Sequence, residues 1–475
     1  MKFRIFIFLL LLTSQLSAQV AINSDNSEPD SSAILDIQST SKGLLTPRMT
    51  EAQRNAISEP AAALMVYQTD GRAGFYFNSG TPSAPNWVKI GTQNDLQAQD
   101  ARTPIDSVAY FANYGSVGYA SYVITEPGSY YLTQNINSAQ SGAFGIVIDA
   151  DDVFLDLNGY IILGDRTGSP GIFSLPSNGG GTGDGIHLEG TRNNITIKNG
   201  TIDSWAGNGI YGNNTNLSSF YNLLIRNNGR HGIEVHDYNV LIDCKSFYNY
   251  YDGIRTGEGC TISDCKSSAN SGYGFKINRF SKLSRCMASY NALDGFSISQ
   301  DGKLVNCSAT ENEGIGIDIS IGAFVSFCLS NRNGEAGIQA FSDCIVANSV
   351  ASYNGQDISS AGSDSTDYSG IKVDGNGGYL YNNVCANNRY AGIAATTLVQ
   401  DTKIVSNLVV QNEYIGILVE NNGGIIVNNY VGGTVNGPSY DFRGTVGHGP
   451  IINVRSAGPL STVTNADHPF ANFNN

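Results

Sequence analysis

Residues 249–269 read NYYDGIRTGEGCTISDCKSSA, and residues 270–290 repeat the pattern as NSGYGFKINRFSKLSRCMASY. Both segments begin with asparagine and place a glycine and an apolar residue at the fourth and fifth following positions. Cysteine recurs every 21 residues at Cys244, Cys265, Cys286, Cys307 and Cys328. Three residue types locked to one period indicate a single supersecondary unit that is stacked many times.

The repeat unit contains short apolar segments and lacks helical periodicity. One strand is expected to start at each Gly-Ile pair, and a second to end at the cysteine column, as in residues 240–246 (VLIDCKS), before a turn at asparagine. Rungs of this length coil into a parallel β-helix, with neighbouring rungs about 4.8 Å apart. We therefore predict an all-β parallel β-helix solenoid with 21 residues per rung.

The asparagine and cysteine columns are interpreted as structural. Asparagine tolerates the left-handed backbone conformation, and its amide can bond the rungs above and below. Exported cysteines usually pair, but five is an odd number, and the column continues as Leu223 upstream and as Ser349 and Asn383 downstream. We expect small buried side chains that fit a bend of the coil. A metal-thiolate column is the less favoured alternative because the column contains no histidine.

The N-terminus carries an export signal. Residues 1–18 (MKFRIFIFLLLLTSQLSA) join a basic start, an apolar run and a small-x-small end, the pattern of a cleaved secretory signal. The apolar run is too short for a membrane-spanning helix, and no later run replaces it. The sequence therefore predicts a protein of the extracellular space or the periplasm without a transmembrane anchor.

The remaining chain divides by composition and periodicity. The predicted segments are a signal peptide (1–18), an N-terminal β-rich attachment or presentation module (19–91), a polar linker (92–106), an N-terminal cap with the first strands (107–184), the β-helix repeats (185–435) and a C-terminal cap (436–475). The chain has 41 acidic and 27 basic residues, a net charge of −14. This balance excludes a protein that follows a nucleic-acid backbone.

Two stretches resemble known families. The phrase Asn-x-x-x-Gly-Ile and residues 153–159 (VFLDLNG) resemble the pectate-lyase-like right-handed parallel β-helix repeat family, over roughly residue 107 to the C-terminus. Residues 42–57 (KGLLTPRMTEAQRNAI) and 64–70 (LMVYQTD) resemble a tail-fibre-like N-terminal module of secreted Bacteroidota proteins. The resemblance implies a right-handed coil. Because this scaffold serves lyases, hydrolases, epimerases, adhesins and tailspikes, it does not imply one activity.

Two insertions interrupt the repeat, at residues 165–184 and 355–369. Both precede a Gly-Ile strand, so we expect both to border one face, as insertions around a binding face of a repeat protein do. On that face, strand alternation points a set of charged, polar and aromatic side chains outward. The predicted substrate-binding residues are Glu234, His236, Tyr251, Tyr273, Asn278, Asp294 and Asp318.

The resemblance also suggests catalytic roles on the same face. In a polysaccharide lyase or epimerase, Arg255 or Lys276 would act as the base, with Asp252 and Glu234 as acid or metal ligands and His231 assisting. In a hydrolase, Asp252 and Asp294 would lie about 9.6 Å apart, near the upper limit for an inverting carboxyl pair. The family's paired aspartates and compact calcium cluster are absent from the sequence. We therefore predict no cofactor, and calcium is an alternative without a supporting motif.

Three functions follow from these patterns. The preferred one is a secreted, non-catalytic protein that binds a polysaccharide or cell-surface glycan, or presents a surface, through the β-helix. The alternative is a polysaccharide lyase, epimerase or glycoside hydrolase acting in the groove on the Gly-Ile sheet. A trimeric, tailspike-like assembly is a third hypothesis, and mass measurement in solution would test it.

Overall fold

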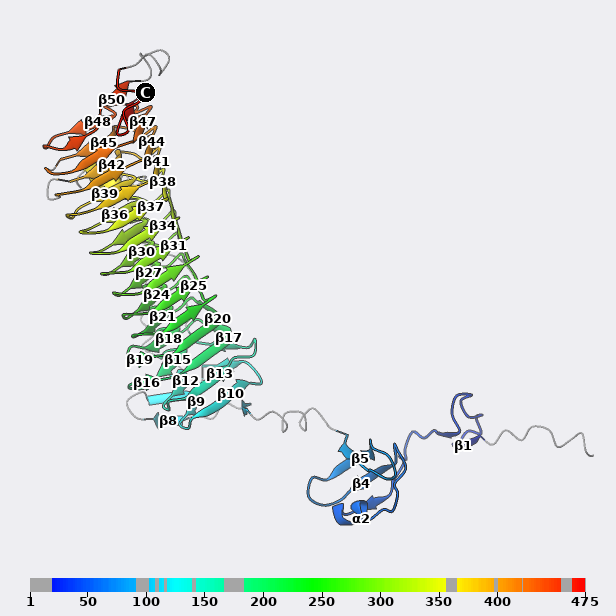
Figure 1. Ribbon diagram of the computed structural model, residues 1–475. Helices are drawn as coiled ribbons and strands as arrows, with labels where there is room; N and C mark the ends of the chain where they lie inside the picture. Colours follow the sequence, from blue (N-terminus) through cyan, green and yellow to red (C-terminus); the bar gives the residue numbers. More distant parts are fainter. Residues whose placement is uncertain are drawn as a thin grey trace, which may run out of the picture. The chain divides into compact units, whose positions relative to one another are not determined.

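The computed structural model describes residues 19–90, 102–106, 111–114, 118–138, 142–165, 183–355, 365–396, 400–420, 422–453 and 464–474 (Figure 1). The chain forms two compact units, divided after Asp100. The predicted signal peptide and most of the predicted linker lie outside the described residues. Among the residues that are described, no helix is both long and apolar enough to cross a bilayer.

The first unit is a small β-rich module. Strands β1 (Val20–Ile22) and β2 (Leu35–Ile37) pair in parallel. A four-stranded sheet contains β3 (Arg48–Met49), β4 (Met65–Gln68), β5 (Gly74–Asn78) and β6 (Trp87–Lys89), with β4 and β5 forming an antiparallel hairpin. The short helix α2 (Glu51–Asn55) begins at Thr50, whose side chain forms a capping box with Gln53. Arg54 anchors the helix because its guanidinium lies 4.4 Å from the centre of the Tyr76 ring.

The second unit is a right-handed parallel β-helix of about 16 turns, with about 22 residues per rung on average. Its first sheet has 15 strands and carries the Gly-Ile pairs (Figure 1). In spatial order these strands are β8 (Phe111–Tyr114), β9 (Gly118–Ile124), β12 (Phe144–Ile148), β15 (Ile186–Leu188), β18 (Ile210–Gly212), β21 (Ile233–Val235), β24 (Ile254–Thr256), β27 (Phe275–Ile277), β30 (Phe296–Ile298), β33 (Ile317–Ile319), β36 (Ile338–Ala340), β39 (Ile371–Val373), β42 (Ala391–Ala395), β45 (Ile415–Val419) and β48 (Tyr440–Phe442).

The rest of each rung contains two strands where the sequence predicted one. The middle strands are β7 (Thr103–Ile105), β10 (Gly128–Leu132), β13 (Val153–Asp156), β22 (Val240–Ile242), β25 (Thr261–Ser263), β28 (Lys282–Ser284), β31 (Lys303–Val305), β34 (Phe324–Ser326), β37 (Ile345–Ala347), β40 (Tyr379–Tyr381), β43 (Lys403–Val405), β46 (Ile425–Val427) and β49 (Gly447–His448). The third strands are β11 (Ile136–Asn137), β14 (Ile161–Leu163), β23 (Lys245–Phe247), β26 (Lys266–Ser268), β29 (Met287–Ser289), β32 (Ser308–Thr310), β35 (Leu329–Asn331), β38 (Val350–Ser352), β41 (Val384–Ala386), β44 (Leu408–Val410), β47 (Tyr430–Gly432), β50 (Ile451–Asn453) and β51 (Asn472–Asn474). In two early rungs one long strand replaces both, β17 (Thr196–Asp203) and β20 (Ser219–Arg226). The short strands β16 (Arg192–Asn193) and β19 (Thr215–Asn216) pair at a turn.

The cysteine column lies at the bend between the middle and third strands. The residue before each cysteine adopts a left-handed conformation, for example Asp243 (φ 51°) and Phe327 (φ 55°). The cysteine that follows turns inward and is fully buried, as at Cys244 and Cys328. All eight cysteines are buried and unpaired. The burial of the unpaired cysteines agrees with a packing role. The bend itself explains the additional strand, because the chain changes direction there and begins a new strand.

The asparagine column forms a continuous hydrogen-bonded ladder inside the coil. Asn270 Nδ2 donates to Asn291 Oδ1 over 3.0 Å, and Asn291 Nδ2 donates to Asn312 Oδ1 over 2.9 Å. The left-handed residue is not the asparagine, as the sequence suggested, but the residue before it, such as Tyr290 (φ 55°). The asparagine therefore serves as a buried amide that satisfies backbone groups at the turn.

Both ends of the coil extend further than predicted. Residues 103–105, assigned to the linker, form β7, which pairs with β10. At the other end, the segment predicted only as a C-terminal cap adds β48 to the first sheet and β51 to the third strands. At the N-terminal edge of the first sheet β8 runs antiparallel to β9, a pairing that covers the edge against other chains.

Candidate functional site

The outward face of the first sheet carries a row of polar side chains, which we call the central row. The central row consists of the residues at the middle position of nine successive strands: His187, Tyr211, Glu234, Arg255, Lys276, Ser297, Asp318, Gln339 and Lys372. Eight steps between rungs give it a length of about 38 Å. The same column is apolar before and after the row, at Val123 and Val147 and at Ala394 and Leu418. All four of these apolar side chains are buried, so the polar surface is bounded at both ends.

The column before each glycine holds the rungs together. Asp252 Oδ1 accepts the backbone N–H of Tyr273 over 3.0 Å, and Asp294 Oδ1 accepts that of Ile315 over 2.8 Å. His231 Nδ1 accepts the N–H of Asp252 in the same way, over 3.1 Å. Each of these side chains thus bonds the backbone of the next rung. This structural role leaves the second oxygen of each aspartate for other contacts.

The most crowded part of the row surrounds Arg255. Its guanidinium lies 3.8 Å from Asp252 Oδ2 and 3.8 Å from Glu234 Oε1, so two carboxylates stabilise its charge. His231 Nδ1 lies 3.3 Å from Asp252 Oδ2. Nδ1 either accepts the Asp252 N–H through its lone pair or, when it carries a proton, donates to the carboxylate, so it makes one of these two contacts at a time. Burial raises the pKa of Asp252, but the hydrogen bond and charge of His231 outweigh burial and hold the pKa below its ordinary value.

Aromatic rings adjoin this cluster. The Lys276 ammonium lies 4.3 Å from the centre of the Tyr273 ring, a cation–π contact. Tyr251 is exposed, and its ring centre lies 5.3 Å from that of His231. The structure therefore places the predicted residues His231, Glu234, Asp252, Arg255, Tyr273 and Lys276 in one neighbourhood, with Tyr251 beside it.

Further along the row, two carboxyl groups favour the protonated state. Burial, with added repulsion from Asp318 and Glu335, raises the pKa of Asp294 to about 7. Burial and the charges of Asp374 and Glu335 raise the pKa of Asp318 to about 6. Asp318 Oδ1 is buried and has no hydrogen-bond partner among the described residues. Asp294 and Asp318, both predicted to bind substrate, thus lie in surroundings opposite to those of Asp252.

The last described part of the second insertion touches the row. Residues 365–368 form the short helix η2 (Ser365–Tyr368). Lys372 Nζ lies 2.5 Å from Asp367 Oδ1 and 2.9 Å from Asp374 Oδ2. Burial lowers the pKa of Lys372, but these two hydrogen bonds outweigh it and raise the pKa. Most of both insertions, residues 166–182 and 356–364, lies outside the described residues.

Sequence reasoning missed the start of the central row. His187 Nδ1 lies 2.8 Å from Asp184 Oδ2, and its Nε2 lies 3.1 Å from Glu189 Oε2. Its ring stacks on Tyr211, with ring centres 5.2 Å apart. His187 and Tyr211 both follow a Gly-Ile pair, so continuing the column upstream of the strict 21-residue block would have found them.

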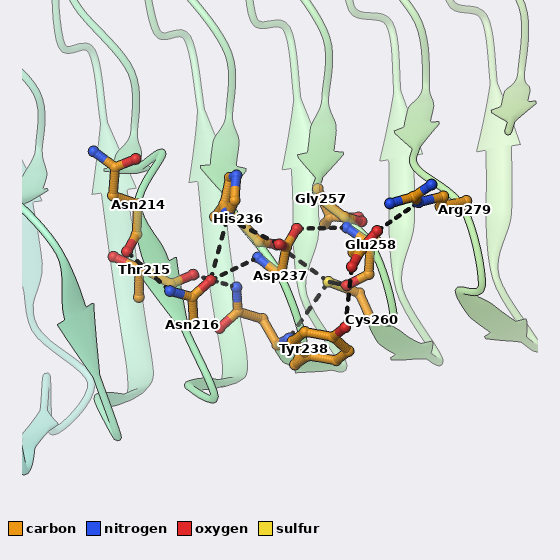
Figure 2. Close-up of polar contacts among 12 residues, drawn as sticks. Asn214, Thr215, Asn216, His236, Asp237, Tyr238, Gly257, Glu258, Cys260 and Arg279 are labelled. Carbon is orange, nitrogen blue, oxygen red and sulfur yellow. Dashed lines mark hydrogen bonds and ion pairs between the residues drawn. The ribbon is translucent and has the colours of Figure 1, made fainter.

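Two predicted residues lie at the turn that follows the first-sheet strands, and Figure 2 labels one of them, His236. His236 Nδ1 lies 3.2 Å from Asn216 Oδ1 and 3.2 Å from Asp237 Oδ2. Asn278 is exposed, and its Oδ1 accepts the backbone N–H of the next residue, over 2.9 Å. His236 and Asn278 thus follow the row at its edge, outside the cluster around Arg255.

The turn itself is held by a charged network. Glu258 accepts from the Tyr238 hydroxyl over 3.0 Å and from Arg279 Nε over 2.5 Å (Figure 2). Asp237 Oδ1 accepts the backbone N–H of Glu258 over 2.7 Å. These contacts bond one rung to the next and account for the charged residues at this turn. In the described part of the chain, no group of three or more acidic, histidine or cysteine side chains is arranged to hold a metal ion.

Models of two known protein families match parts of the chain, and one of them agrees with the β-helix fold. A model described as "Right handed beta helix region" matches residues 177–282. A second, described as "Phage tail like trimerisation region", matches residues 21–103. Together with the structure, these matches define the class of protein: a right-handed parallel β-helix with a tail-fibre-like N-terminal module. No curated protein sequence matches the chain.

Solved structures with similar coils include enzymes and a tailspike. The mannuronan C-5 epimerase AlgE4 A-module of Azotobacter vinelandii is 15% identical, with a TM-score of 0.38, and the match covers 67% of this chain and 88% of that one. Pectate lyase Pel9A is 16% identical, with a TM-score of 0.29, covering 52% and 73%. The Dettilon tailspike protein is 12% identical, with a TM-score of 0.34, covering 67% and 59%. At these values the similarities carry no conclusion about activity.

Proposed function

We propose that this chain is a secreted glycan-binding protein that holds a polymeric sugar along the central row and forms a trimer through its N-terminal module. The observation that carries the glycan proposal is the row itself. It is a straight, polar surface about 38 Å long, bounded by apolar side chains at both ends. The match to a trimerisation region over residues 21–103 supports the assembly.

The chemistry of the row suits sugars. Cations at Arg255 and Lys276 can bind carboxylate or hydroxyl groups, and Asp252 and Glu234 can accept sugar hydroxyls. The exposed ring of Tyr251 offers an apolar face beside them, as sugar C–H groups require. Both signs of charge occur along the row, which favours a hydroxyl-rich polymer over a simple polyanion.

Glycan binding should therefore depend on the cations of the central row and not on lysines elsewhere on the surface. We expect Lys276→Ala and Arg255→Ala each to weaken binding about tenfold or more, the loss of roughly one charge-assisted hydrogen bond. Lys282→Ala is the matched control, because Lys282 is exposed on a middle strand away from the row. Calorimetry on a panel of uronate and neutral polysaccharides measures the effect. Absence of binding to every glycan, or an equal loss in the control, would contradict the proposal.

A second candidate, glycoside hydrolysis, is favoured by one observation. Asp252 and Asp294 share a column two rungs apart, about 9.6 Å, and their pKa values shift in opposite directions. Such a pair supplies an acid and a base. Asp294 would give its proton to the leaving oxygen as the glycosidic C–O bond breaks. Asp252 would take a proton from the water that attacks the sugar carbon. A lyase that uses Arg255 as its base is less favoured than this hydrolase. The base of a lyase must be uncharged, and two carboxylates stabilise the charged form of Arg255.

The hydrolysis candidate is tested by reducing-end release from any polysaccharide that binds. We expect Asp294→Asn to lower the rate at least about a hundredfold, the usual contribution of a general acid, while binding is retained. Lyase or epimerase chemistry would instead appear as unsaturated-sugar absorbance or as epimerised product without new reducing ends. Binding without turnover in the unmodified chain would exclude the enzyme and leave the binding function.

A further inference from the structure

The outward face of the middle and third strands changes character along the coil. From β25 to β32, the 12 outward positions are polar except Met287 and Val305. From β34 to β47, the 20 outward positions include four polar residues, Ser326, Asn331, Ser352 and Lys403. The others are apolar: Phe324, Leu329, Ile345, Ala347, Val350, Tyr379, Tyr381, Val384, Ala386, Val405, Leu408, Val410, Ile425, Val427, Tyr430 and Gly432. We call this surface the apolar half.

The apolar half is large. Five rungs at about 4.8 Å give about 24 Å, and eight residues across two strands and a bend give about 26 Å, hence roughly 600 Å². A typical monomer exposes no designed apolar patch above about 400 Å², and a standard interface covers about 800 Å² per partner with 20–30 residues. Sixteen of the 20 outward positions are at least partly exposed, since Ser326, Ala347, Ser352 and Gly432 are buried, so the apolar half as a whole approaches the size of one side of a protein–protein interface.

The shape of the apolar half matches threefold symmetry. The middle and third strands meet at the bend, where Phe327, Asn348, Asn382 and Ser406 are left-handed and point away from the core. Around a threefold axis, each copy contacts two neighbours through two different surfaces. Two apolar faces meeting at a bend supply those two surfaces, one for each neighbour.

We propose that the apolar half is the contact between three copies of this chain, with the bend residues lining the symmetry axis. The inference rests on the trimer proposed above and adds the surface through which the β-helices meet. The occupant is a second copy because the chain itself contains the region that matches a trimerisation module. The polar half, from β25 to β32, would stay in contact with water.

Crosslinking tests the geometry in the full chain. Phe327 is 60% exposed at the bend, so Phe327→Cys would place three thiols near the axis. A short bismaleimide should then join two of every three chains, about two thirds of the total, into covalent dimers. The control is Tyr290→Cys, which is 54% exposed at another corner of the coil and should give none. The eight native cysteines are buried and should not react in the folded protein.

Charge insertion tests the energetics. Leu329→Glu combined with Leu408→Glu should raise the dissociation constant of the assembly at least about tenfold, because each charge would be buried against apolar side chains. The matched control is Met287→Glu, in the same column of the third strands but in the polar half. Met287, Leu329 and Leu408 are 44%, 40% and 41% exposed, so both variants should fold, which circular dichroism checks.

The outcomes separate the inference from the functions on which it rests. A trimeric mass, crosslinking at residue 327 and weakening by the two glutamates together support the interface. A trimer without crosslinking, and without any effect of the glutamates, overturns the interface and leaves association through the N-terminal module alone. A monomeric mass overturns both. Glycan binding is measured separately, so its loss or retention bears only on the central row.

Discussion

Asp252 and Asp294 occupy the same column two rungs apart, but their carboxyl groups meet opposite surroundings. Asp252 lies against His231 and Arg255, which stabilise its negative charge. Asp294 is buried beside Asp318 and Glu335, which repel a negative charge. The sequence places the two residues in equivalent positions, so the difference comes from the side chains on neighbouring rungs. Identical residues on one face therefore differ in protonation near neutral pH.

This contrast predicts a pH dependence of stability. Because the folded state raises the pKa of Asp294 to about 7, it holds a proton that the unfolded chain releases near pH 4. The free energy of unfolding should therefore decrease as pH rises from about 4 to 7. In Asp294→Asn this part of the decrease should disappear, so the variant should gain on the order of 4 kcal/mol relative to the unmodified chain between pH 4 and pH 8. Urea unfolding at several pH values measures it.

A control separates this effect from general charge changes. Asp264 is exposed, and its hydrogen bonds with Arg285 lower its pKa. Stability from this contact is present above about pH 4 and lost as pH falls. Asp264→Asn should therefore cause a small change of opposite sign. Equal pH profiles for Asp294→Asn and the unmodified chain would show that Asp294 is ionised in the folded protein.

At the scale of the element, buried ladders hold one rung to the next. The asparagine ladder satisfies backbone groups at the turn before each first-sheet strand. Asn291 is fully buried, accepts from both the backbone and the side chain of Asn270, and donates to Asn312. Because the groups it serves are shielded from water, each lost partner leaves an unsatisfied polar atom.

Asn291→Ala should accordingly destabilise the β-helix by about 3 kcal/mol, since it leaves the buried backbone N–H of Asn270 unpaired, removes one acceptor of the Asn270 amide and breaks the bond to Asn312. Gln300→Ala is a suitable control because Gln300 is exposed, and surface changes usually stay within about 0.5 kcal/mol. The measurement is the urea midpoint at constant slope. A loss below about 1 kcal/mol would mean that water replaces the amide in the ladder.

At the scale of the whole molecule, the β-helix behaves as a stack of equivalent rungs. The residues of one column stay in register over many rungs, as Phe275, Phe296 and Ile317 do in the first sheet. Each rung contacts mainly its two neighbours, so stability is approximately a sum over rungs and their interfaces. Function then depends on which rungs carry particular outward residues.

Removal of one complete rung tests this modularity. Deleting residues 291–311 joins Tyr290 to Asn312 and restores every column, so the shortened chain should fold with a melting temperature only a few degrees lower. Deleting residues 291–300 instead shifts the register of strands and should prevent cooperative folding. Circular dichroism with thermal melting distinguishes the two. A failure of the 21-residue deletion would show long-range coupling along the coil.

Particular residues show which features of the fold and of the central row could be predicted from the sequence and which could not. The Gly-Ile strands, the buried cysteine column and the outward row from Glu234 to Lys372 could be predicted, because each repeats with one period. His187 and Tyr211 were missed because the period lengthens before the strict block. The third strand was missed because the left-handed residue at the bend changes from rung to rung, for example from Arg285 (φ 54°) to Asn382 (φ 53°), so no single turn residue marks the bend in the sequence.

The sequence by itself determined the β-helix, its rung length and the columns, because a 21-residue period of asparagine, glycine and cysteine admits only stacked strands. Only the tertiary structure decided which side chains across rungs meet. It paired Asp252 with His231 and Arg255, surrounded Asp294 with acids, and gathered apolar residues from five rungs onto one surface. The physical reason is that, apart from the Asp252–Arg255 pair, these contacts join residues on different rungs, 21 or more positions apart in the sequence, and their energies depend on burial and distance in space.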